Sequence, residues 1–493
     1  MEKVRLPVVQ GEMFAGPAPE LESSLLADGS RKLIHPADVR GRFLTARRLV
    51  FAVLIAFWAI VPFLRVDGRP FLMLDVEHRR FFIFGGVFGA QDAWRLWFIL
   101  TGVGLALVIT TSLFGRVWCG WTCPHTVFLE AFFRPIERLV EGPREVRVRV
   151  DTGEWTTSKT MRKVVKHTIF VVLAALVAHV FVGYFVSPYR LWAMIFAGPG
   201  KHPEAFAWAI GLTGIFYGNF GFFREQTCVG VCPYGRLQSV LVDQDTVVVG
   251  YERPRGEPRA KASEKAKNED LGDCVDCKRC VVVCPMGIDI RNGLQPDCIG
   301  CAQCSDACDE IMDKLHRPRG LVRYDTTRAL DGGKRQIWRP RAYLYVAVTV
   351  VWVVAAFFLL RGRVAFEANI LRVGATPFVI DGDSVRNAFN VHVVNKGSDP
   401  VTFELEAKGE GVSFVVPIKR SELPAFGGVD VPIIATVPRS ATARPIPITV
   451  DVRGGDGSLR TVSAVLLGPG PFGPGPSGSA PFRSAPPGPG GVK

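Results

Sequence analysis

The chain has 493 residues, a formal net charge of +13, a mean hydropathy of +0.21 and 21% charged residues. This composition is too apolar for a purely soluble protein, and the length allows several domains. A basic chain could bind nucleic acid, but here the basic residues gather in short connections between apolar stretches, so no nucleic-acid partner is expected.

Five apolar stretches follow an N-terminal segment, residues 1–48, and each approaches the roughly 17 to 25 residues that cross a bilayer. They are Leu49–Leu64, Leu96–Phe114, Thr168–Val186, Ala205–Phe223 and Ala342–Leu360. Arg47 and Arg48 precede the first stretch, where long basic side chains are expected to reach the membrane interface. We predict four membrane helices in residues 49–249 and a fifth in residues 342–360.

The distribution of Lys and Arg predicts the orientation of these helices. Basic residues are abundant before the first stretch and between the second and third, and sparse or balanced by acids in the connections on the other side. Because such residues are retained on the cytoplasmic side, we expect a multi-pass protein of the bacterial cytoplasmic membrane. The N-terminus and the segment between the fourth and fifth stretches would be cytoplasmic, and the C-terminal domain periplasmic.

The second and fourth stretches are each followed by the pattern C-x3-C-P. A spacing of four places two thiols on one helix face, which suits a shared metal. Alternatively, the proline begins a new helix, and the second cysteine becomes its N-cap, where the thiol pKa is lowered. Two copies on one membrane face favour a redox or metal site over buried structural cysteines, and thiolates suit Cu(I). The cysteines are Cys119 and Cys123 in the first copy and Cys228 and Cys232 in the second.

Residues 250–341 are predicted to be a cytoplasmic linker followed by a ferredoxin domain. Eight cysteines form two consecutive runs, C-x2-C-x2-C-x3-C-P and the same spacing ending in Asp309. In two-cluster bacterial ferredoxins the fourth cysteine of each run binds the other cluster. This predicts Cys274, Cys277, Cys280 and Cys308 for one 4Fe-4S cluster and Cys298, Cys301, Cys304 and Cys284 for the second. Structural zinc and disulfides fit the spacing poorly.

Residues 361–467 change to short β-prone runs separated by turn residues. The runs are at 388–394, 401–407, 412–418, 429–437, 446–452 and 460–466. About six or seven such strands predict an antiparallel immunoglobulin-like sandwich, which we interpret as a docking module. Proline and glycine dominate residues 468–493, which predicts a disordered tail. The predicted fold class is a multi-domain membrane protein, an α-helical bundle of about five spans with a two-cluster ferredoxin-type insert and a C-terminal all-β sandwich.

Several segments together resemble one known family. They are RVWCGWTCPHTVF at 116–128, CPYGR around Cys232, YERPRGEPR at 251–259 and the ferredoxin segment at 272–324. They are similar to the cytochrome c oxidase accessory proteins of the CcoG, FixG and RdxA type, and the similarity runs from about residue 33 to 467. His125 departs from the pattern, because glutamine is expected there, and the Gly/Pro tail is an addition.

The resemblance implies a membrane polyferredoxin that reduces Cu(II) to Cu(I) during assembly of a cbb-type haem–copper oxidase. Its partners would be oxidase subunits, or copper transporters and chaperones. We hypothesise that Cys119, Cys123, Cys228 and Cys232 bind and reduce copper, while the two clusters supply electrons from a cytosolic or quinol donor.

Other functions remain open at this stage. One is a quinol-linked membrane electron carrier, and another is a non-enzymatic copper chaperone or assembly scaffold with structural clusters. A redox sensor is less favoured, because no signalling domain is visible. The sequence leaves open the electron donor, the oligomeric state (including a homodimer), and whether the four membrane-edge thiols form one site. It also leaves open whether His179, deep in the third stretch, is functional or a packing residue.

Overall fold

The computed structural model describes residues 33–469 except 67, 78–79, 85, 90–92, 266–270, 337, 362–365, 375, 398–399, 426 and 456. Most of the predicted N-terminal segment, residues 1–32, and nearly all of the predicted disordered tail, from residue 470, lie outside the described residues. The chain divides into two compact units. The first extends to Leu359 without Val87–Gly89, and the second contains those three residues and the chain from Leu360 onward.

Within the described chain, five helices of the first unit are long and apolar enough to cross a membrane, as predicted. They are α1 (Arg42–Ile60, extended by the 3-10 turn η2, Val61–Phe63), α2 (Ala93–Phe114), α7 (Thr157–Val186), α9 (Pro203–Tyr217, extended by the π-helix η5, Gly218–Phe223) and α16 (Pro340–Arg361). Large apolar side chains on them, such as Leu100 and Val351, are about 70% exposed, as expected for helices that face lipid. Helix α7 begins earlier than predicted because the Thr156 hydroxyl accepts a bond from the Lys159 amide and caps it.

Several short elements connect these helices. Those on the first connection are β1 (Arg65–Val66), β2 (Arg69–Pro70), β3 (Leu72–Asp75), β4 (Arg80–Ile83) and β5 (Gly86–Phe88), and α8 (Pro188–Ala197) joins α7 to α9. The connection from α2 to α7 holds α3 (Val117–Trp121), α4 (Pro124–Phe128), the π-helix η4 (Leu129–Phe133), α5 (Arg134–Glu141) and α6 (Arg144–Thr152). The π-helix η6 (Thr227–Val231) and α10 (Pro233–Leu241) follow η5. Aromatic packing of Phe133 against Phe170 and Phe220 fixes η4 onto α7 and η5.

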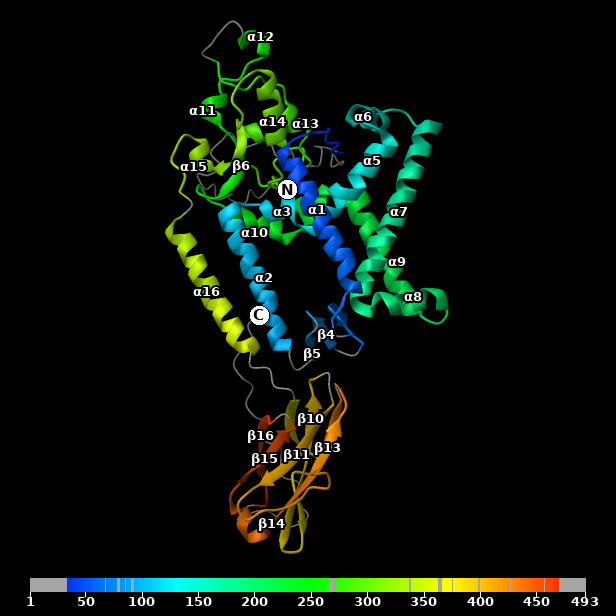
Figure 1. Cartoon of the computed structure of the whole chain (residues 1–493), viewed down its shortest axis with the longest axis vertical. Helices are drawn as coiled ribbons and strands as arrows, with labels where there is room; N and C mark the ends of the chain where they lie inside the picture. The colour runs from blue at the N-terminus through cyan, green and yellow to red at the C-terminus, as the bar shows by residue number, and fades with distance from the viewer. Residues whose placement is uncertain are drawn as a thin grey trace, which may run out of the picture. The chain divides into compact units, whose positions relative to one another are not determined.

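The ferredoxin segment lies at the α3 and α10 end of the membrane helices (Figure 1). It contains β6 (Val247–Tyr251), α11 (Arg253–Gly256), α12 (Ala262–Lys265), α13 (Arg279–Val282), η7 (Ile290–Asn292), α14 (Gln303–Lys314), β7 (Val322–Thr326) and α15 (Thr327–Leu330). Strands β6 and β7 pair antiparallel, and β6 is buried along its whole length. The predicted boundary between residues 249 and 250 therefore falls inside a strand, because the apolar run VVVGY belongs to the ferredoxin core.

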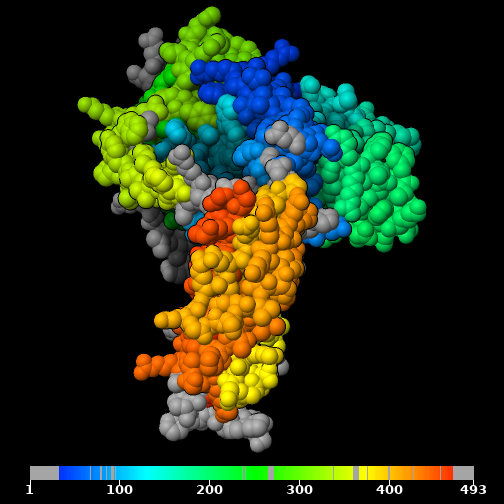
Figure 2. All heavy atoms as spheres, turned by 60° about the horizontal axis from the view of Figure 1, so that its bottom comes forward, coloured from blue at the N-terminus to red at the C-terminus, as the bar shows by residue number. Residues whose placement is uncertain are grey.

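The second unit is a sandwich of two antiparallel sheets, which confirms the predicted all-β class; it is the yellow-to-red part of Figure 2. One sheet has the order β12-β14-β10-β8 with β9 beside β10, and the other β13-β11-β15-β16. The strands are β8 (Phe366–Arg372), β9 (Val379–Asp381), β10 (Ser384–Asn395), β11 (Val401–Lys408), β12 (Ser413–Val415), β13 (Arg420–Leu423), β14 (Gly428–Pro438), β15 (Ile446–Gly454) and β16 (Leu459–Leu466). Alternate residues of β10 and β14 are buried between the sheets. The sequence reading missed β8, β9 and β13, of which β13 is short, polar and paired along one side only.

Candidate functional site

The first group of predicted cluster ligands lines one cavity. Cys274, Cys277, Cys280 and Cys308 surround it together with Tyr251 and Arg291. Asp276 and Lys278 adopt positive φ angles of 49° and 54°, a backbone conformation that non-glycine residues adopt rarely and that allows the loop to curl. Burial raises the pKa of Cys280 and of Cys308 to about 12.

The second group lines a neighbouring cavity. Cys284, Cys298, Cys301 and Cys304 surround it among apolar residues of η7 and of the loop before α14, and Cys280 also borders it. Burial raises the pKa of Cys284 to about 12 and that of Cys298 to about 11. All twelve cysteines lie within the described residues, and none forms a disulfide.

These donor sets fit one 4Fe-4S cluster in each cavity. Each cavity gathers four soft thiols in apolar surroundings, where a free thiolate would be costly and ligation to iron would offset its charge. The grouping includes the crossed fourth cysteines, Cys308 with the first run and Cys284 with the second, as the spacing predicts. The individual ligand roles stay predictions.

The two C-x3-C-P motifs share an order of elements, although the first short helix, α3, is an α-helix and its counterpart, η6, a π-helix. Cys119 lies on α3 and Cys228 on η6, whereas Cys123 and Cys232 are the N-cap residues of α4 and α10, each followed by a proline in the first turn. The N-cap alternative is therefore the one that the structure adopts. The lowering of thiol pKa expected there is not found at Cys123, whose pKa burial raises despite the opposing effect of nearby backbone amides. Burial also raises the pKa of Cys119 to about 11 and that of Cys228 to about 12.

The second motif packs directly on the first. The Cys119 sulfur lies 3.4 Å from Oε1 and 3.3 Å from Nε2 of Gln238, a fully buried residue of α10. The Arg116 guanidinium donates to the carbonyl of Gly235. Besides burial, electrostatic repulsion from Cys123, Cys119 and Cys232 raises the pKa of Cys228, so the four thiols lie close enough to interact electrostatically. Among the described residues, however, no three His, Cys, Asp or Glu side chains are arranged to hold a metal ion.

The first motif docks on the loop of the second cluster cavity. A Cβ added to Gly120 would lie 2.5 Å from the Ile299 carbonyl oxygen and 3.0 Å from the Cys301 amide nitrogen, so only glycine permits this approach. The Trp121 indole donates to the Tyr324 hydroxyl at 2.9 Å, and that hydroxyl donates to the Gly300 carbonyl. Cys119 and Cys123 therefore lie on either side of Gly120, whose backbone contacts the loop that holds Cys301.

Arg47 holds the same junction from α1. Its Nε donates to the Gly120 carbonyl at 2.9 Å, and its Nη1 lies 2.7 Å from the Gln303 side-chain oxygen once that amide is oriented to suit its neighbours. The interpretation of Arg47 as an interfacial side chain is wrong, since the side chain is fully buried. The buried Asp306 of α14 accepts from the Phe43 and Leu44 amides at 3.1 and 2.8 Å and so caps α1. Sequence reasoning missed these residues because each pairs with a distant segment.

A buried ion pair anchors the start of the second motif. Arg224, which follows η5, donates to both carboxylate oxygens of Glu137 on α5, at 3.1 and 3.0 Å. Burial alone would raise the pKa of Glu137, but the charge of Arg224 and its hydrogen bonds lower that pKa to about 2. The two motifs are thereby connected through α5 as well as through Gln238.

The two histidines considered at the sequence level both bond to backbone. His125 Nε2 lies 2.9 Å from the Arg224 carbonyl oxygen and Nδ1 lies 3.1 Å from Asn219 Nδ2, while the ring stacks on Phe220. Burial lowers the pKa of His125. His179 Nδ1 lies 2.7 Å from the Ala175 carbonyl oxygen of its own helix. Their contacts are those of packing residues.

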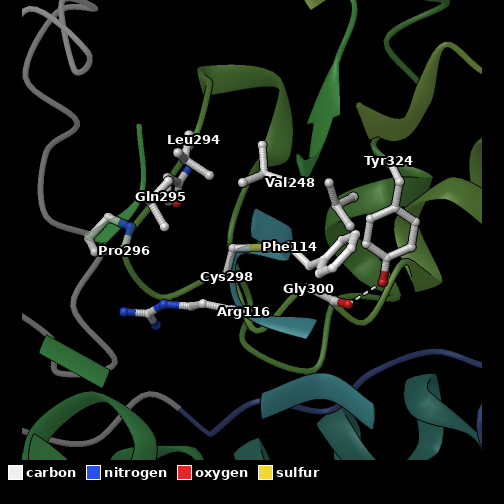
Figure 3. A pocket seen from close by; sticks show the side chains of 11 residues that line it. Phe114, Arg116, Val248, Leu294, Gln295, Pro296, Cys298, Gly300 and Tyr324 are labelled. Carbon is white, nitrogen blue, oxygen red and sulfur yellow. Dashed lines mark hydrogen bonds between the residues drawn. The ribbon is translucent and has the colours of Figure 1, made fainter. Parts of the chain in front are cut away.

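A pocket opens beside the second cluster cavity where α2 ends. Figure 3 shows the Cys298 sulfur pointing toward the ring of Phe114, with Val248 nearby. Arg116 and Tyr324 supply polar groups to an otherwise largely apolar lining.

Three family profiles match the chain. One described as "4Fe-4S dicluster domain" matches residues 223–327, and one described as "4Fe-4S binding domain" matches residues 96–143, which include Cys119 and Cys123. A third, an "IG-like fold at C-terminal of FixG", matches residues 356–469. The chain is 35% identical to the nitrogen fixation protein FixG of Rhizobium meliloti, over 77% of this chain and 80% of the relative. The chain belongs to the FixG and RdxA family.

A second curated relative agrees with this membership, and two further comparisons cover parts of the chain. Protein RdxA of Cereibacter sphaeroides is 35% identical over 82% of this chain and 87% of its own length. The ferredoxin-type protein NapH of Haemophilus influenzae is 25% identical over 44% of this chain and 68% of its own. A crystal structure of a FixG-related protein from Vibrio parahaemolyticus aligns with 21% of this chain and 97% of its own, at 15% identity and a TM-score of 0.20. The chain is thus a membrane-type iron–sulfur protein of the FixG and RdxA family.

Proposed function

We propose that this protein transfers single electrons to Cu(II) at the thiols of the two C-x3-C-P motifs, and that the Cu(I) formed serves assembly of a cbb-type oxidase. The observation that carries the proposal is the contact of Gly120, between Cys119 and Cys123, with the loop that holds Cys298 and Cys301. It brings the thiols of the first motif next to the second cluster cavity.

The four motif thiols suit the product of this reaction. When bound, the iron–sulfur clusters supply one low-potential electron at a time, so each Cu(II) gains one electron and leaves as Cu(I). Cu(I) is soft and prefers thiolate, and its binding would displace the protons that these buried thiols retain.

The basic connections support a cytoplasmic location for this site and for the ferredoxin segment. We propose oxidase subunits or copper carriers as partners, with the sandwich unit as the docking module.

A second candidate function is that of a quinol-linked electron carrier. The pocket beside Cys298, with Phe114 at the end of a membrane helix, lies where a membrane-borne donor would approach the second cluster cavity, although at about 30 Å³ it admits a quinol ring only if its lining moves. In this case electrons would come from the membrane and copper need not be the acceptor.

The test uses anaerobically purified full-length protein with both clusters loaded. The C119S/C228S variant should keep about eight iron atoms per chain, as two 4Fe-4S clusters require, but lose Cu(II) reduction by dithionite-reduced protein. Unchanged reduction would remove these cysteines from the mechanism. Stoichiometric copper binding without reduction would favour a chaperone or scaffold, and reduction of the clusters by a soluble quinol would favour the second candidate.

A further inference from the structure

A cleft of about 820 Å³ lies between the N-terminal half of α1, the segment η4–α5 and residues 36–40. The proposed electron transfer does not use it. Among the described residues, six arginines and two carboxylates line it, which leaves an excess of four positive charges. The arginines are Arg40, Arg47, Arg48, Arg134, Arg138 and Arg147, and the carboxylates are Asp38 and Glu130. The charge balance favours an anionic ligand.

The few acidic partners do not satisfy these arginines. Asp38 pairs with Arg138 at 2.6 Å, and Arg134 pairs with Glu130 and lies 3.6 Å from the buried Glu225 outside the cleft, whereas Arg48 makes no ion pair with any described residue. Arg147 lies 3.7 Å from Glu137, which does not line the cleft.

Three of the arginines are also more than nine-tenths buried. Each keeps a nitrogen that has no hydrogen-bond partner in the described structure: Nη2 of Arg47, Nε of Arg134 and Nε of Arg147. Each guanidinium makes other hydrogen bonds, Arg134 to the Pro285 carbonyl and Arg147 to the Pro36 carbonyl among them. Leaving a buried guanidinium N–H without a partner still costs free energy, and an anion in the cleft would offset that cost.

The other half of the cleft is apolar. Phe51, Ala52 and Ile55 lie on one face of α1 beyond Arg47 and Arg48, and Ala131 and Phe132 lie on the opposite wall. Because α1 is a candidate membrane span, this half belongs to the depth of the acyl chains, while the arginines cluster toward the helix end. The ligand that matches both halves has an anionic head and an apolar chain.

We propose that the cleft binds an anionic phospholipid, with its phosphate against the arginines and an acyl chain along the Phe51–Ile55 face of α1. Guanidinium groups bind phosphate in bidentate geometry, and basic pockets between membrane helices select anionic head groups. Arg47 and Gln303 border the cleft and also contact each other, and Arg47 bonds the first cysteine motif. Lipid in this cleft therefore lies against the residues that join α1 to the ferredoxin segment. A soluble phosphate shares the head-group chemistry, but it would leave the apolar half unused.

The test is native mass spectrometry of full-length cluster-loaded protein in detergent, titrated with phosphatidylglycerol or with phosphatidylcholine of the same acyl chains. R48Q/R138Q should bind phosphatidylglycerol about thirtyfold more weakly, as expected for two arginines near an anionic head group. The matched control is R149Q, because Arg149 is exposed on α6 and lies outside the cleft. A52W keeps every charge but fills the apolar half, and it should also weaken lipid binding.

Equal binding of the two lipids, or wild-type binding by R48Q/R138Q, would overturn the proposal. Inorganic phosphate is the probe for the other source. Displacement of phosphatidylglycerol by millimolar phosphate, together with unchanged binding by A52W, would assign the cleft to a soluble phosphorylated ligand and would also overturn it.

Discussion

The two C-x3-C-P motifs both place their second cysteine at a helix N-cap but differ in what surrounds them. In the first, Gly120 lies against the loop of the second cluster cavity, and in the second, a Cβ added to Gly230, which stands one position later in the repeat, would meet open space. The second motif contacts the first through Gln238 and Gly235 instead. The first copy of the repeated motif thus contacts the ferredoxin segment, whereas the second copy contacts the first. We infer that electrons reach the first copy and that the second completes the copper site.

The largest expected effect comes from removing one pair of cysteines at a time. C119S/C123S should lower the rate of Cu(II) reduction at saturating copper at least a hundredfold, because it removes the thiols beside the cluster loop. C228S/C232S should mainly raise the copper concentration needed for half-maximal rate, because that pair contributes ligands. Stopped-flow assays over a range of copper concentrations separate the two effects, and identical profiles for both variants would contradict the asymmetry.

The next effect is on stability, through the Glu137–Arg224 pair that ties the motifs together. E137Q should destabilise the protein by about 3 to 5 kcal/mol, because it leaves the buried Arg224 without its carboxylate partner. Glu145 on the neighbouring α6 is exposed, so E145Q is the control and should change little. Thermal unfolding of full-length protein in detergent measures both.

The same pair predicts a pH dependence. The pKa of Glu137 is about 2 in the folded protein and about 4.3 when unfolded, so its stabilisation is complete above the higher value and is lost as pH falls toward 2. The difference in stability between wild type and E137Q should therefore shrink from pH 5 downward. A difference that stays constant across this range would rule out the ionised pair as its source.

A smaller effect is expected where the first motif meets the cluster loop. G120A places a methyl group 2.5 Å from the Ile299 carbonyl, so the loop or α3 has to shift, and we expect Cu(II) reduction to slow about tenfold with iron content unchanged. The control is G230A, a glycine-to-alanine change in the second motif, one position later than Gly120 in the repeat; its added methyl meets open space, and it should reduce copper at the wild-type rate. Equal rates for the two variants would mean that the docking contact is not needed for electron transfer.

The smallest effect is expected at the contact between the motifs. Q238L removes the hydrogen bonds to Cys119 and should weaken Cu(I) binding by about fivefold, in line with one hydrogen bond of about 1 kcal/mol. Competition with a chromophoric Cu(I) chelator measures the affinity. Unaltered affinity would show that Gln238 only packs.

The sequence was most informative where the pattern is local. Cysteine spacing predicted the two four-cysteine groups, apolar length predicted the five spans, and the prolines offered the N-cap position of Cys123 and Cys232. Contacts between distant segments could not be read in this way. Arg47 donates a hydrogen bond to Gly120, 73 residues away in sequence, and Asp306 caps α1 from at least 262 residues away. Because such partners are invisible in a local pattern, the buried Arg47 was interpreted as an interfacial residue. Burial likewise reversed the expected pKa of Cys123, because an N-cap position does not reveal how much protein covers it.

The central claim is that electrons pass from the ferredoxin segment to copper held by the motif thiols. Freeze-quench EPR of anaerobically reduced full-length protein, mixed with one equivalent of Cu(II), tests it most directly. The account predicts that the Cu(II) signal and the reduced-cluster signal disappear together, one spin for one spin, in wild type and not in C119S/C123S. Bound Cu(II) that keeps its signal while the clusters stay reduced would contradict it.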